Sequence, residues 1–184
     1  MVTPFVAGKD TRGGTRIPAT SVTDAIAQRP LVRPATEADA EEIFRVHSDS
    51  IRVLCSGKYE PEEIAAWIAV RTPASYRVAL ATRQLFVAEW QGEVVGFGQL
   101  DPEKAEIEAC YVAPGAIGAG VGVALLFRME TEALRRGHSA VRLNSTLNAE
   151  GFYAKCGYRW LGKATHRVSG NVDLACIRME KELA

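Results

Sequence analysis

The chain has 184 residues, and its 22 Lys and Arg residues balance 22 Asp and Glu residues, so the formal net charge is zero. Hydrophobic residues make up 47% of the sequence, which suits one globular domain with a buried core, whereas the length is too short for two full-sized domains. A chain without excess positive charge lacks the overall field that attracts nucleic acid or anionic lipid, so we expect neither as a partner.

The four cysteines, Cys55, Cys110, Cys156 and Cys176, are widely spaced. They form no CxxC motif, and no histidine stands at zinc-finger spacing from them, so we expect reduced thiols and no metal site. No run of about 18 apolar residues is present to span a bilayer, and the first residues lack the apolar core of a signal peptide. The sequence therefore predicts a cytoplasmic protein that does not enter a membrane.

The N-terminal third of the chain begins with a segment of irregular composition. Residues 1–29 are rich in Thr, Gly and Pro and predict an extension or linker before a domain that spans residues 30–184. A short strand is expected at residues 31–33, and Thr36 with Asp39 predicts the capped start of a helix. A second helix is predicted to begin at Pro61 and to end before Pro73.

The pattern changes to strands after residue 84. Runs at residues 85–88, 93–98 and 105–112 are separated by turn residues, and they predict an antiparallel meander. We then expect a long amphipathic helix from about residue 120 to 136, a strand at 141–143, a short helix at 149–156 and a closing strand at 172–179. The predicted fold class is mixed α/β.

Four of the sixteen glycines crowd into eight residues between the third strand and the long helix, at Gly115, Gly118, Gly120 and Gly122. Glycine lets the backbone approach a ligand, and a helix start presents unpaired N–H groups, so the loop could bind an anion. A helix that crosses close to a strand would explain the same glycines. The loop lacks the Lys and Ser/Thr of a Walker loop and the third glycine of a dinucleotide loop, which leaves a pyrophosphate held by backbone amides, as in coenzyme A.

Two motifs stand at an informative separation. The first is Val112-Ala113-Pro114 with Ile117-Gly118-Ala119-Gly120-Val121-Gly122, and the second runs from Ala149 through Phe152-Tyr153 to Gly157-Tyr158. Together, over roughly residues 31–182, they resemble the GNAT superfamily of acetyl-CoA-dependent N-acetyltransferases. The resemblance implies a mixed, mostly antiparallel sheet flanked by helices. It also implies direct transfer of acetyl from acetyl-CoA to a primary amine of a small molecule or peptide within a ternary complex.

The resemblance further implies roles for individual residues. Acetyl-CoA would bind to a strand edge and to the glycine loop, at Cys110, Val112, Ile117, Gly118, Ala119, Gly120, Val121, Gly122 and Val123. Tyr153 would be the general acid, because a phenol stays protonated at neutral pH and can donate to the departing sulfur. The family's usual Arg or Gln at the loop opening is Ile117 here, and its usual Asn before Ala149 is Thr146.

The general base and the acceptor site are less narrowly indicated. Strand alternation places Glu106 and Glu108 on one face with Cys110 and Val112, so either is a candidate base; a solvated polar face is the alternative. In this superfamily the first two helices bound the acceptor site, where Tyr59 and Trp67 are the aromatic candidates, although Trp67 also fits a helix core. A homodimer is left open. The alternative function is a non-catalytic CoA-binding or regulatory module.

Overall fold

The computed structural model describes residues 29–169 and 172–184, so all but the last residue of the predicted extension lies outside the described residues. The described strands form one sheet in the order β1-β2-β3-β4-β5-β7-β6. The strands are β1 (Leu31–Pro34), β2 (Gln84–Trp90), β3 (Glu93–Asp101), β4 (Glu106–Val112), β5 (Ala140–Thr146), β6 (Arg159–Ser169) and β7 (Val172–Glu182). All neighbouring pairs are antiparallel except β4 and β5, which confirms the predicted mixed, mostly antiparallel sheet.

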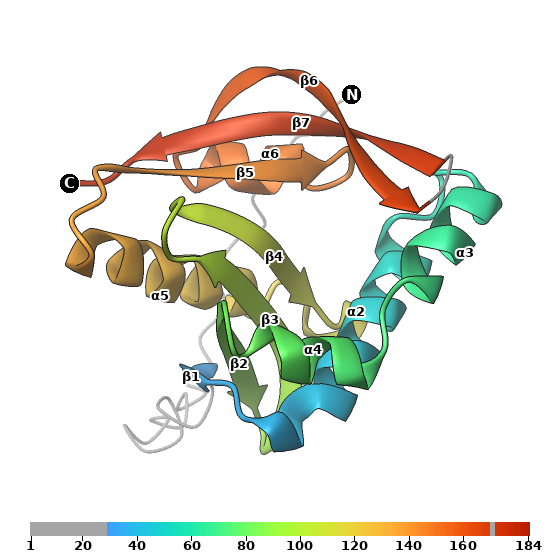
Figure 1. Ribbon diagram of the computed structural model, residues 1–184, viewed down its shortest axis with the longest axis horizontal. Coiled ribbons are helices and arrows are strands. Elements are labelled where there is room, and N and C mark those ends of the chain that lie inside the picture. Colours follow the sequence, from blue (N-terminus) through green and yellow to red (C-terminus); the bar gives the residue numbers. More distant parts are fainter. Residues whose placement is uncertain (1–28, 170–171) are drawn as a thin grey trace, which may run out of the picture.

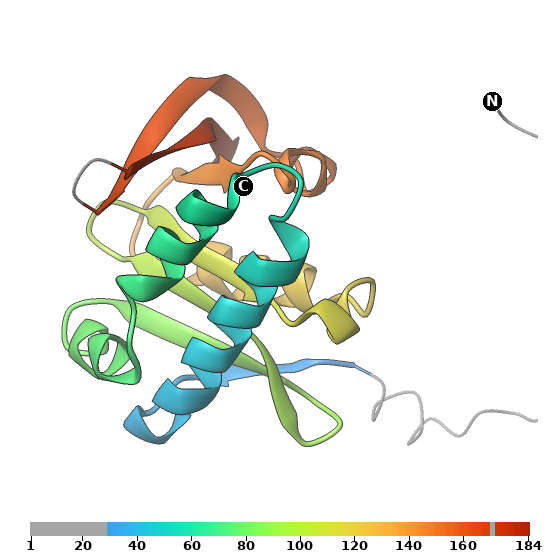
Figure 2. The same ribbon diagram turned by 90° about the vertical axis from the view of Figure 1, so that its right-hand side faces the viewer.

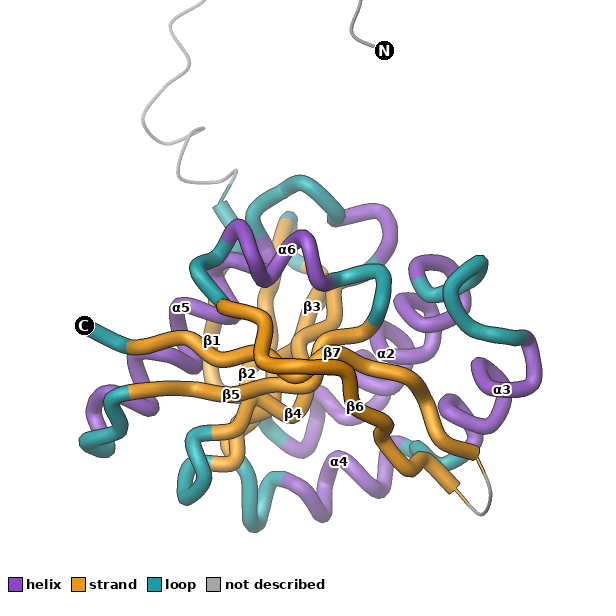
Figure 3. Tube along the Cα trace, turned by 90° about the horizontal axis from the view of Figure 1, so that it is seen from above, coloured by secondary structure: helices purple, strands orange, loops and turns teal. Residues whose placement is uncertain are grey.

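Helices cover both faces of this sheet (Figure 1). They are α2 (Ala40–Leu54), α3 (Pro61–Ala69), α4 (Pro73–Ala79), α5 (Val121–Arg135) and α6 (Glu150–Lys155), with short 3-10 turns η1 (Glu37–Asp39) and η2 (Pro114–Ala116). Seen from above, α4 and α6 lie on opposite sides of the strands (Figure 3). The helix α2 lies along one face of the sheet beside α3 (Figure 2). None of the described helices is long and apolar enough to cross a membrane.

Each face of the sheet has its own apolar core. On one face, α5 packs Leu125, Leu126 and Met129 against β3, β4 and β5. On the other face, α2 and α4 pack Ile43 and Tyr76 against β2 and β3. A third cluster joins the end of α2 and the helix α3 to β7. These cores fix the two faces of β4 between α5 and α2.

Glycines on β3 allow α5 to lie close to the sheet. A Cβ atom on Gly96 would lie 2.7 Å from Val121 Cγ1, and one on Gly98 would lie 2.8 Å from Met129 Sδ. Such distances are far inside van der Waals contact. A side chain at Gly98 would have to displace the flexible end of Met129, whereas one at Gly96, whose Cβ would also lie 3.1 Å from the Tyr111 carbonyl, would require α5 to move. The position of α5, which carries the glycine loop at its start, is thereby set by β3.

The structure adds two elements that the sequence interpretation missed. The helix α4 begins at Pro73 after the cap residue Thr72, whose hydroxyl accepts a hydrogen bond from Ser75 N–H at 3.3 Å. Pro73 was expected to follow a helix end, whereas it occupies the first position of a new helix, where its missing N–H costs nothing. The strand β6 contains register shifts near Trp160 and near Arg167, and these shifts break the alternation by which a strand is recognised.

The sheet opens between its two central strands. The parallel pair β4 and β5 is joined in register only at Glu106 and Ile107, opposite Arg142 and Leu143. Beyond these residues β4 runs away beneath β5 and β7 (Figure 1). The rest of β4 therefore has one free edge, and the opening leads between α2 on one side and α5 on the other.

Candidate active site

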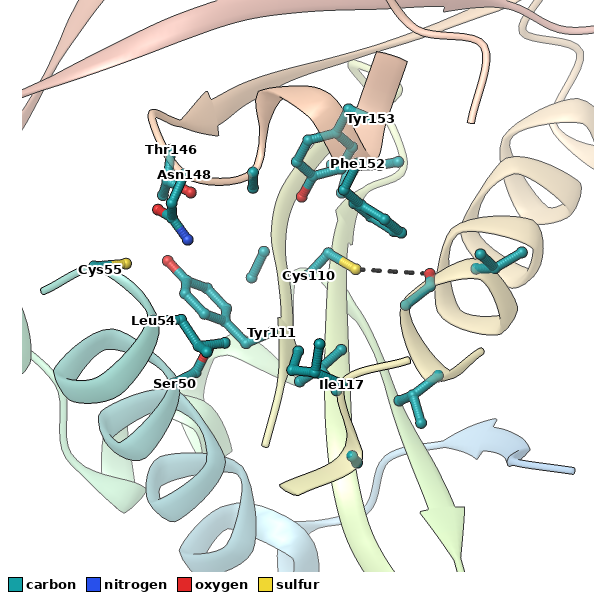
Figure 4. A pocket seen from close by; sticks show the side chains of 18 of the residues that line it. Ser50, Leu54, Cys55, Cys110, Tyr111, Ile117, Thr146, Asn148, Phe152 and Tyr153 are labelled. Atoms are coloured by element: carbon teal, nitrogen blue, oxygen red, sulfur yellow. Dashed lines mark hydrogen bonds between the residues drawn. The ribbon is translucent and has the colours of Figure 1, made fainter. Parts of the chain in front are cut away.

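A cleft of about 580 Å³ fills the opening between β4 and β5. Its walls come from β4, the η2–α5 loop, the end of β5, the start of α6 and the last turn of α2 (Figure 4). Because five separate segments meet here, the site is a product of the tertiary fold. The cleft lies where the parallel pair β4 and β5 separates within the sheet, a location at which ligand sites are common.

The free edge of β4 presents unpaired backbone groups to the cleft. Ala113 N–H donates to the Val95 carbonyl at 2.8 Å on the β3 side. Since hydrogen-bonded and non-bonded pairs alternate in an antiparallel ladder, Tyr111 also bonds toward β3, and Cys110 and Val112 face the opposite edge. The structure thus places the predicted strand-edge residues Cys110 and Val112 along the cleft, with backbone groups available to an extended ligand.

The start of α5 presents a second set of free donors. Within the described chain, no acceptor pairs with the N–H groups of Gly118, Gly120, Val121, Gly122 and Val123. All five residues line the cleft, as does Ile117. Ala119 does not line it, and its N–H is already bonded to the Ala116 carbonyl at 3.3 Å. Unpaired N–H groups at the positive end of a 15-residue helix form a favourable site for an anion.

The glycines of this loop serve both of the roles that the sequence left open. Gly118 and Gly120 have φ values of 88° and 81°, and each has open space where a Cβ atom would be. These two positions require glycine for backbone conformation, because left-handed φ is costly for other residues. A Cβ atom on Gly122 would lie 2.9 Å from the Phe152 ring, so this third glycine permits close packing between α5 and α6.

Tyr153 projects its hydroxyl into the cleft from α6, on the same side of β4 as Cys110 (Figure 4). Burial is the main cause that raises the pKa of Tyr153 well above its usual value, so the phenol stays protonated at neutral pH. Its ring packs edge-on against Phe152 and Tyr158 at centroid distances of 5.1 and 5.6 Å. Behind it, the Tyr158 hydroxyl donates to Glu130 at 2.9 Å, and Lys181 donates to the same carboxylate at 2.7 Å. These contacts hold the Tyr153 ring in one orientation.

The expectation that Glu106 and Glu108 share a face with Cys110 and Val112 is wrong. The β3–β4 ladder shifts register, so that Gln99 faces Ala109 while Leu100 faces Ile107, and Glu108 is the extra, bulged residue. On the N-terminal side of the bulge, Ile107 shares the α5 core with Cys110 and Val112, whereas Glu108 does not. Strict alternation fails here because one inserted residue reverses the face of everything that precedes it.

The two carboxylates consequently lie in different surroundings. Glu108 lines the cleft, and its Oε2 accepts hydrogen bonds from Arg83 Nε at 2.8 Å and Gln99 Nε2 at 2.6 Å. No described residue hydrogen-bonds to its Oε1, which stays available to water or ligand. Glu106 lies opposite Arg142 at the closed end of the β4–β5 pair and does not line the cleft. The structure separates the two residues that the sequence could not distinguish.

The aromatic acceptor candidates Tyr59 and Trp67 lie outside the cleft. The Tyr59 hydroxyl donates to the Ala175 carbonyl at 2.7 Å and accepts from Leu147 N–H at 3.0 Å, so it ties the segment after α2 to β7 and the end of β5. Trp67 is buried against Tyr59, with ring centroids 5.6 Å apart. Both rings belong to the packed cluster beneath the cleft, and this placement supports the core interpretation of Trp67.

Several lining residues were not identified from sequence. They are Ser50, Leu54 and Cys55 at the end of α2, Tyr111 on β4, Thr146 at the end of β5 and Asn148 after it. The Tyr111 side chain points away from Cys110, toward the part of the cleft that contains Asn148 (Figure 4). Its position between Cys110 and Val112 gave a signal, since alternate residues of a strand that lines a cleft can contribute on both faces. The α2 residues gave none, because only folding brings them to β4.

The cysteines in the cleft are unsuited to act as nucleophiles. Burial raises the pKa of Cys110 to about 12 and that of Cys55 to about 11, so both stay protonated at neutral pH. The Cys110 thiol lies 4.0 Å from the Gly122 carbonyl (Figure 4). In residues 29–169 and 172–184, no group of three or more His, Cys, Asp or Glu side chains is arranged to hold a metal ion.

His47 lies beneath Tyr111 and supports it. Its ring meets the Tyr111 ring edge-on at 4.4 Å, and its Nδ1 lies 2.7 Å from the Tyr76 hydroxyl. Burial, with a smaller contribution from the Arg71 cation, lowers the pKa of His47 from 6.5 to about 3. A buried histidine that stays neutral to such low pH does not serve as a base near neutrality.

The lowered pKa of His47 predicts a pH-dependent stability. The unfolded chain binds a proton on this residue near pH 6.5 and the folded chain does so only near pH 3, so stability falls as the pH drops between these values. We expect His47 to account for a loss of about 2 kcal/mol between pH 6.5 and 5. In His47→Asn, which keeps an acceptor for Tyr76, urea unfolding over this range should show a shallower slope with pH. An unchanged slope would contradict a neutral, buried His47.

Comparison with known proteins identifies one family by both sequence and structure. A family model described as an acetyltransferase (GNAT) domain matches residues 55–183. A GCN5-related N-acetyltransferase from Rhodopseudomonas palustris is 31% identical, with a TM-score of 0.78 over 84% of this chain and 96% of its own. Comparison with curated protein sequences gives no match.

More distant structures share the fold. The PaiA N-acetyltransferase of Thermoplasma acidophilum, solved with coenzyme A, is 21% identical, with a TM-score of 0.69 over 83% of this chain and 98% of its own. YncA of Salmonella typhimurium, solved with acetyl-CoA, is 19% identical, with a TM-score of 0.58 over 84% of this chain and 94% of its own. Given the family match over most of the domain and the 31% identity to the Rhodopseudomonas protein, this chain belongs to the GNAT family of acetyltransferases.

Proposed function

We propose that the protein is an N-acetyltransferase that transfers the acetyl group of acetyl-CoA directly to a primary amine. One observation carries the proposal: the free edge of β4, the five unpaired N–H groups at the start of α5 and the Tyr153 hydroxyl all line one cleft. A strand edge can pair with an extended arm, N–H groups can bind a pyrophosphate, and a hydroxyl can protonate a sulfur leaving group.

The residues present fit acetyl-CoA. The N–H groups of Gly118, Gly120 and Val121–Val123 would hold the pyrophosphate, and the edge groups of Cys110 and Val112 would pair with the pantetheine arm. An N–H group of this edge would also polarise the thioester carbonyl, as donors of an oxyanion hole do. Ile117 supplies no charge, so the anion would be bound mainly by the backbone, which agrees with a chain of zero net charge.

The remaining residues account for the protons. Acetyl-CoA supplies an activated acyl group; the amine nitrogen bonds to the acetyl carbon as the carbon–sulfur bond breaks. Tyr153 would donate its proton to the sulfur as the bond breaks, which avoids release of a free thiolate. Glu108, held by Arg83 and Gln99 with Oε1 free, would accept the proton that the amine loses, through water. Glu108 then releases the proton to solvent and Tyr153 regains one from solvent, so both residues return to their starting states.

A non-catalytic CoA-binding module is the second candidate. It is favoured by the hydrophobic Ile117 at the loop opening and by the ion pair that occupies one oxygen of Glu108. Such a module would use the same loop and strand edge for binding, but it would release no thiol in the presence of amines.

Two measurements test these alternatives. Acetyl-CoA is expected to raise the melting temperature, because a ligand that binds only the folded chain stabilises it by mass action, whereas ATP and NAD should not. A thiol-release assay across simple amines, amino-acid amides, peptides and polyamines should then find an acceptor. No thermal shift with millimolar acetyl-CoA would exclude both functions, and a shift without thiol release from any amine would leave the non-catalytic module.

A further inference from the structure

The strand β4 divides the cleft into two chemically different halves (Figure 4). The half beside α5 contains Cys110, the glycine loop and Tyr153, which are the groups proposed to bind acetyl-CoA. The half beside α2 is lined by Ser50, Leu54, Cys55, Glu108, Tyr111, Thr146 and Asn148. We take this second half, called the α2 half below, as the place where an acceptor would lie.

Tyr111 is held by three aromatic side chains. Its ring stacks on Phe97 at 5.5 Å with an interplanar angle of 14°, and it meets His47 and Trp67 edge-on at 4.4 and 6.4 Å. These contacts leave the hydroxyl end directed toward the side of the cleft that contains Asn148 (Figure 4). A hydroxyl fixed in this way can both donate and accept a hydrogen bond at a defined position.

Apart from Glu108, which is paired with Arg83, the polar groups of the α2 half are uncharged. Ser50, Tyr111, Thr146 and Asn148 each provide a neutral donor and acceptor. Of the described residues that line the whole cleft, Glu108 alone carries a charge, and Arg83 is paired with it. A buried charge without a partner is strongly disfavoured. An uncharged amide, in contrast, can donate its N–H and accept at its carbonyl from the neutral groups of this half.

The geometry points to an acceptor whose amino group is next to an uncharged amide, as in an amino-acid amide or the α-amino end of a peptide, with Tyr111 and Asn148 binding that amide. This inference rests on the acetyltransferase function proposed above. The basicity of such amines agrees with it. An α-amino group has a pKa of about 8, so at pH 8 about half of it is unprotonated and able to attack, against under about 1% of a lysine-like amine.

Three small amines test the inference. Glycinamide, glycine and ethylenediamine carry the same amino group beside an amide, a carboxylate and a second amine. We expect kcat/KM for glycinamide, calculated per concentration of unprotonated amine so that differences in amine pKa do not contribute, to exceed that for each of the other two by at least about tenfold, because only the amide requires no counter-ion. Equal values, or a higher value for glycine or ethylenediamine, would overturn the inference while the acetyltransferase function stood.

Variants locate the preference in the α2 half. Asn148→Asp places a carboxylate there and should shift the glycinamide-to-ethylenediamine ratio of kcat/KM toward the diamine by about tenfold or more. Asn144→Asp, the same change at an exposed position of β5 outside the cleft, should leave the ratio unchanged. Tyr111→Phe should raise KM for glycinamide while KM for acetyl-CoA stays the same. If Asn148→Asp behaves like Asn144→Asp, the acceptor does not meet Asn148 and the inference fails.

A wider panel of amines distinguishes a wrong acceptor class from a wrong proposed function. The acceptor class alone would be contradicted if the wild-type protein acetylated an aromatic amine or a polyamine but none of the three test amines. Protein that binds acetyl-CoA and acetylates no amine would contradict the proposed function, and the acceptor inference with it.

Discussion

Replacing Tyr153 with Phe is expected to lower kcat at least about 100-fold while the affinity for acetyl-CoA stays within about twofold. Phe retains the ring that packs between Phe152 and Tyr158, so the fold of α6 is preserved. The change removes only the hydroxyl, which burial keeps protonated and which faces the cleft beside Cys110. Steady-state kinetics with a thiol-release readout, together with the thermal shift given by acetyl-CoA, would measure both quantities.

Tyr76→Phe is the matched control. This tyrosine is also buried and also loses a hydroxyl, but its partner is His47 Nδ1 and it does not line the cleft. We expect a loss of about 1 kcal/mol in the free energy of unfolding, with kcat changed by less than about twofold. Should Tyr153→Phe turn over as fast as Tyr76→Phe, Tyr153 would have no part in the proton transfer.

Replacing Gly120 with Ala is expected to weaken acetyl-CoA binding about tenfold and to lower the free energy of unfolding by about 1 to 2 kcal/mol. Gly120 has φ of 81° immediately before the first residue of α5, and alanine is strained in that conformation. Relief of the strain requires the loop to turn, and that movement misaligns the N–H groups of Val121 and Gly122. Denaturant unfolding and isothermal titration with acetyl-CoA would give the two values.

Gly115→Ala is the control within the same loop. Gly115 lies in η2, its φ is not in the left-handed region, and no atom lies within 4 Å of the position that its Cβ would occupy. Both stability and acetyl-CoA affinity should therefore match wild type. Equal losses in the two variants would show that the loop tolerates no side chain at all, and the conformational explanation for Gly120 would be wrong.

Local patterns predicted most of the fold. The strand β1, the meander β2–β4 and the helices α2, α3, α5 and α6 were each expected from periodicity, caps and turn residues, with differences of a few residues at their ends. At the Gln91-Gly92 turn both residues have positive φ, 54° and 84°, as a two-residue hairpin requires. The misses, α4 and β6, have identifiable causes: the proline was assigned to the wrong helix end, and register shifts broke the alternation of β6.

The candidate site likewise contains residues that local sequence patterns predicted and residues that they did not. Eight of the nine expected acetyl-CoA residues line the cleft, because a strand, a loop and a helix start are consecutive in the chain and need no distant contact to be recognised. The carboxylates were misassigned to the face of Cys110 and Val112, since the bulge at Glu108 appears only when β4 is paired with β3. The α2 half of the cleft could not be predicted from the sequence either. Ser50 and Asn148 are far apart in the chain, and only the packing of α2 on the sheet brings them together.

The sequence by itself determined a neutral α/β domain with a backbone anion loop at residues 117–123 and a tyrosine at 153, because these features depend on residue type and short spacing. The tertiary structure alone decided which amides are free, which carboxylate faces the cleft and which side chains form its α2 half. These depend on how far β4 separates from β5, and that separation is set by the packing of α5 and α2 on opposite faces of the sheet.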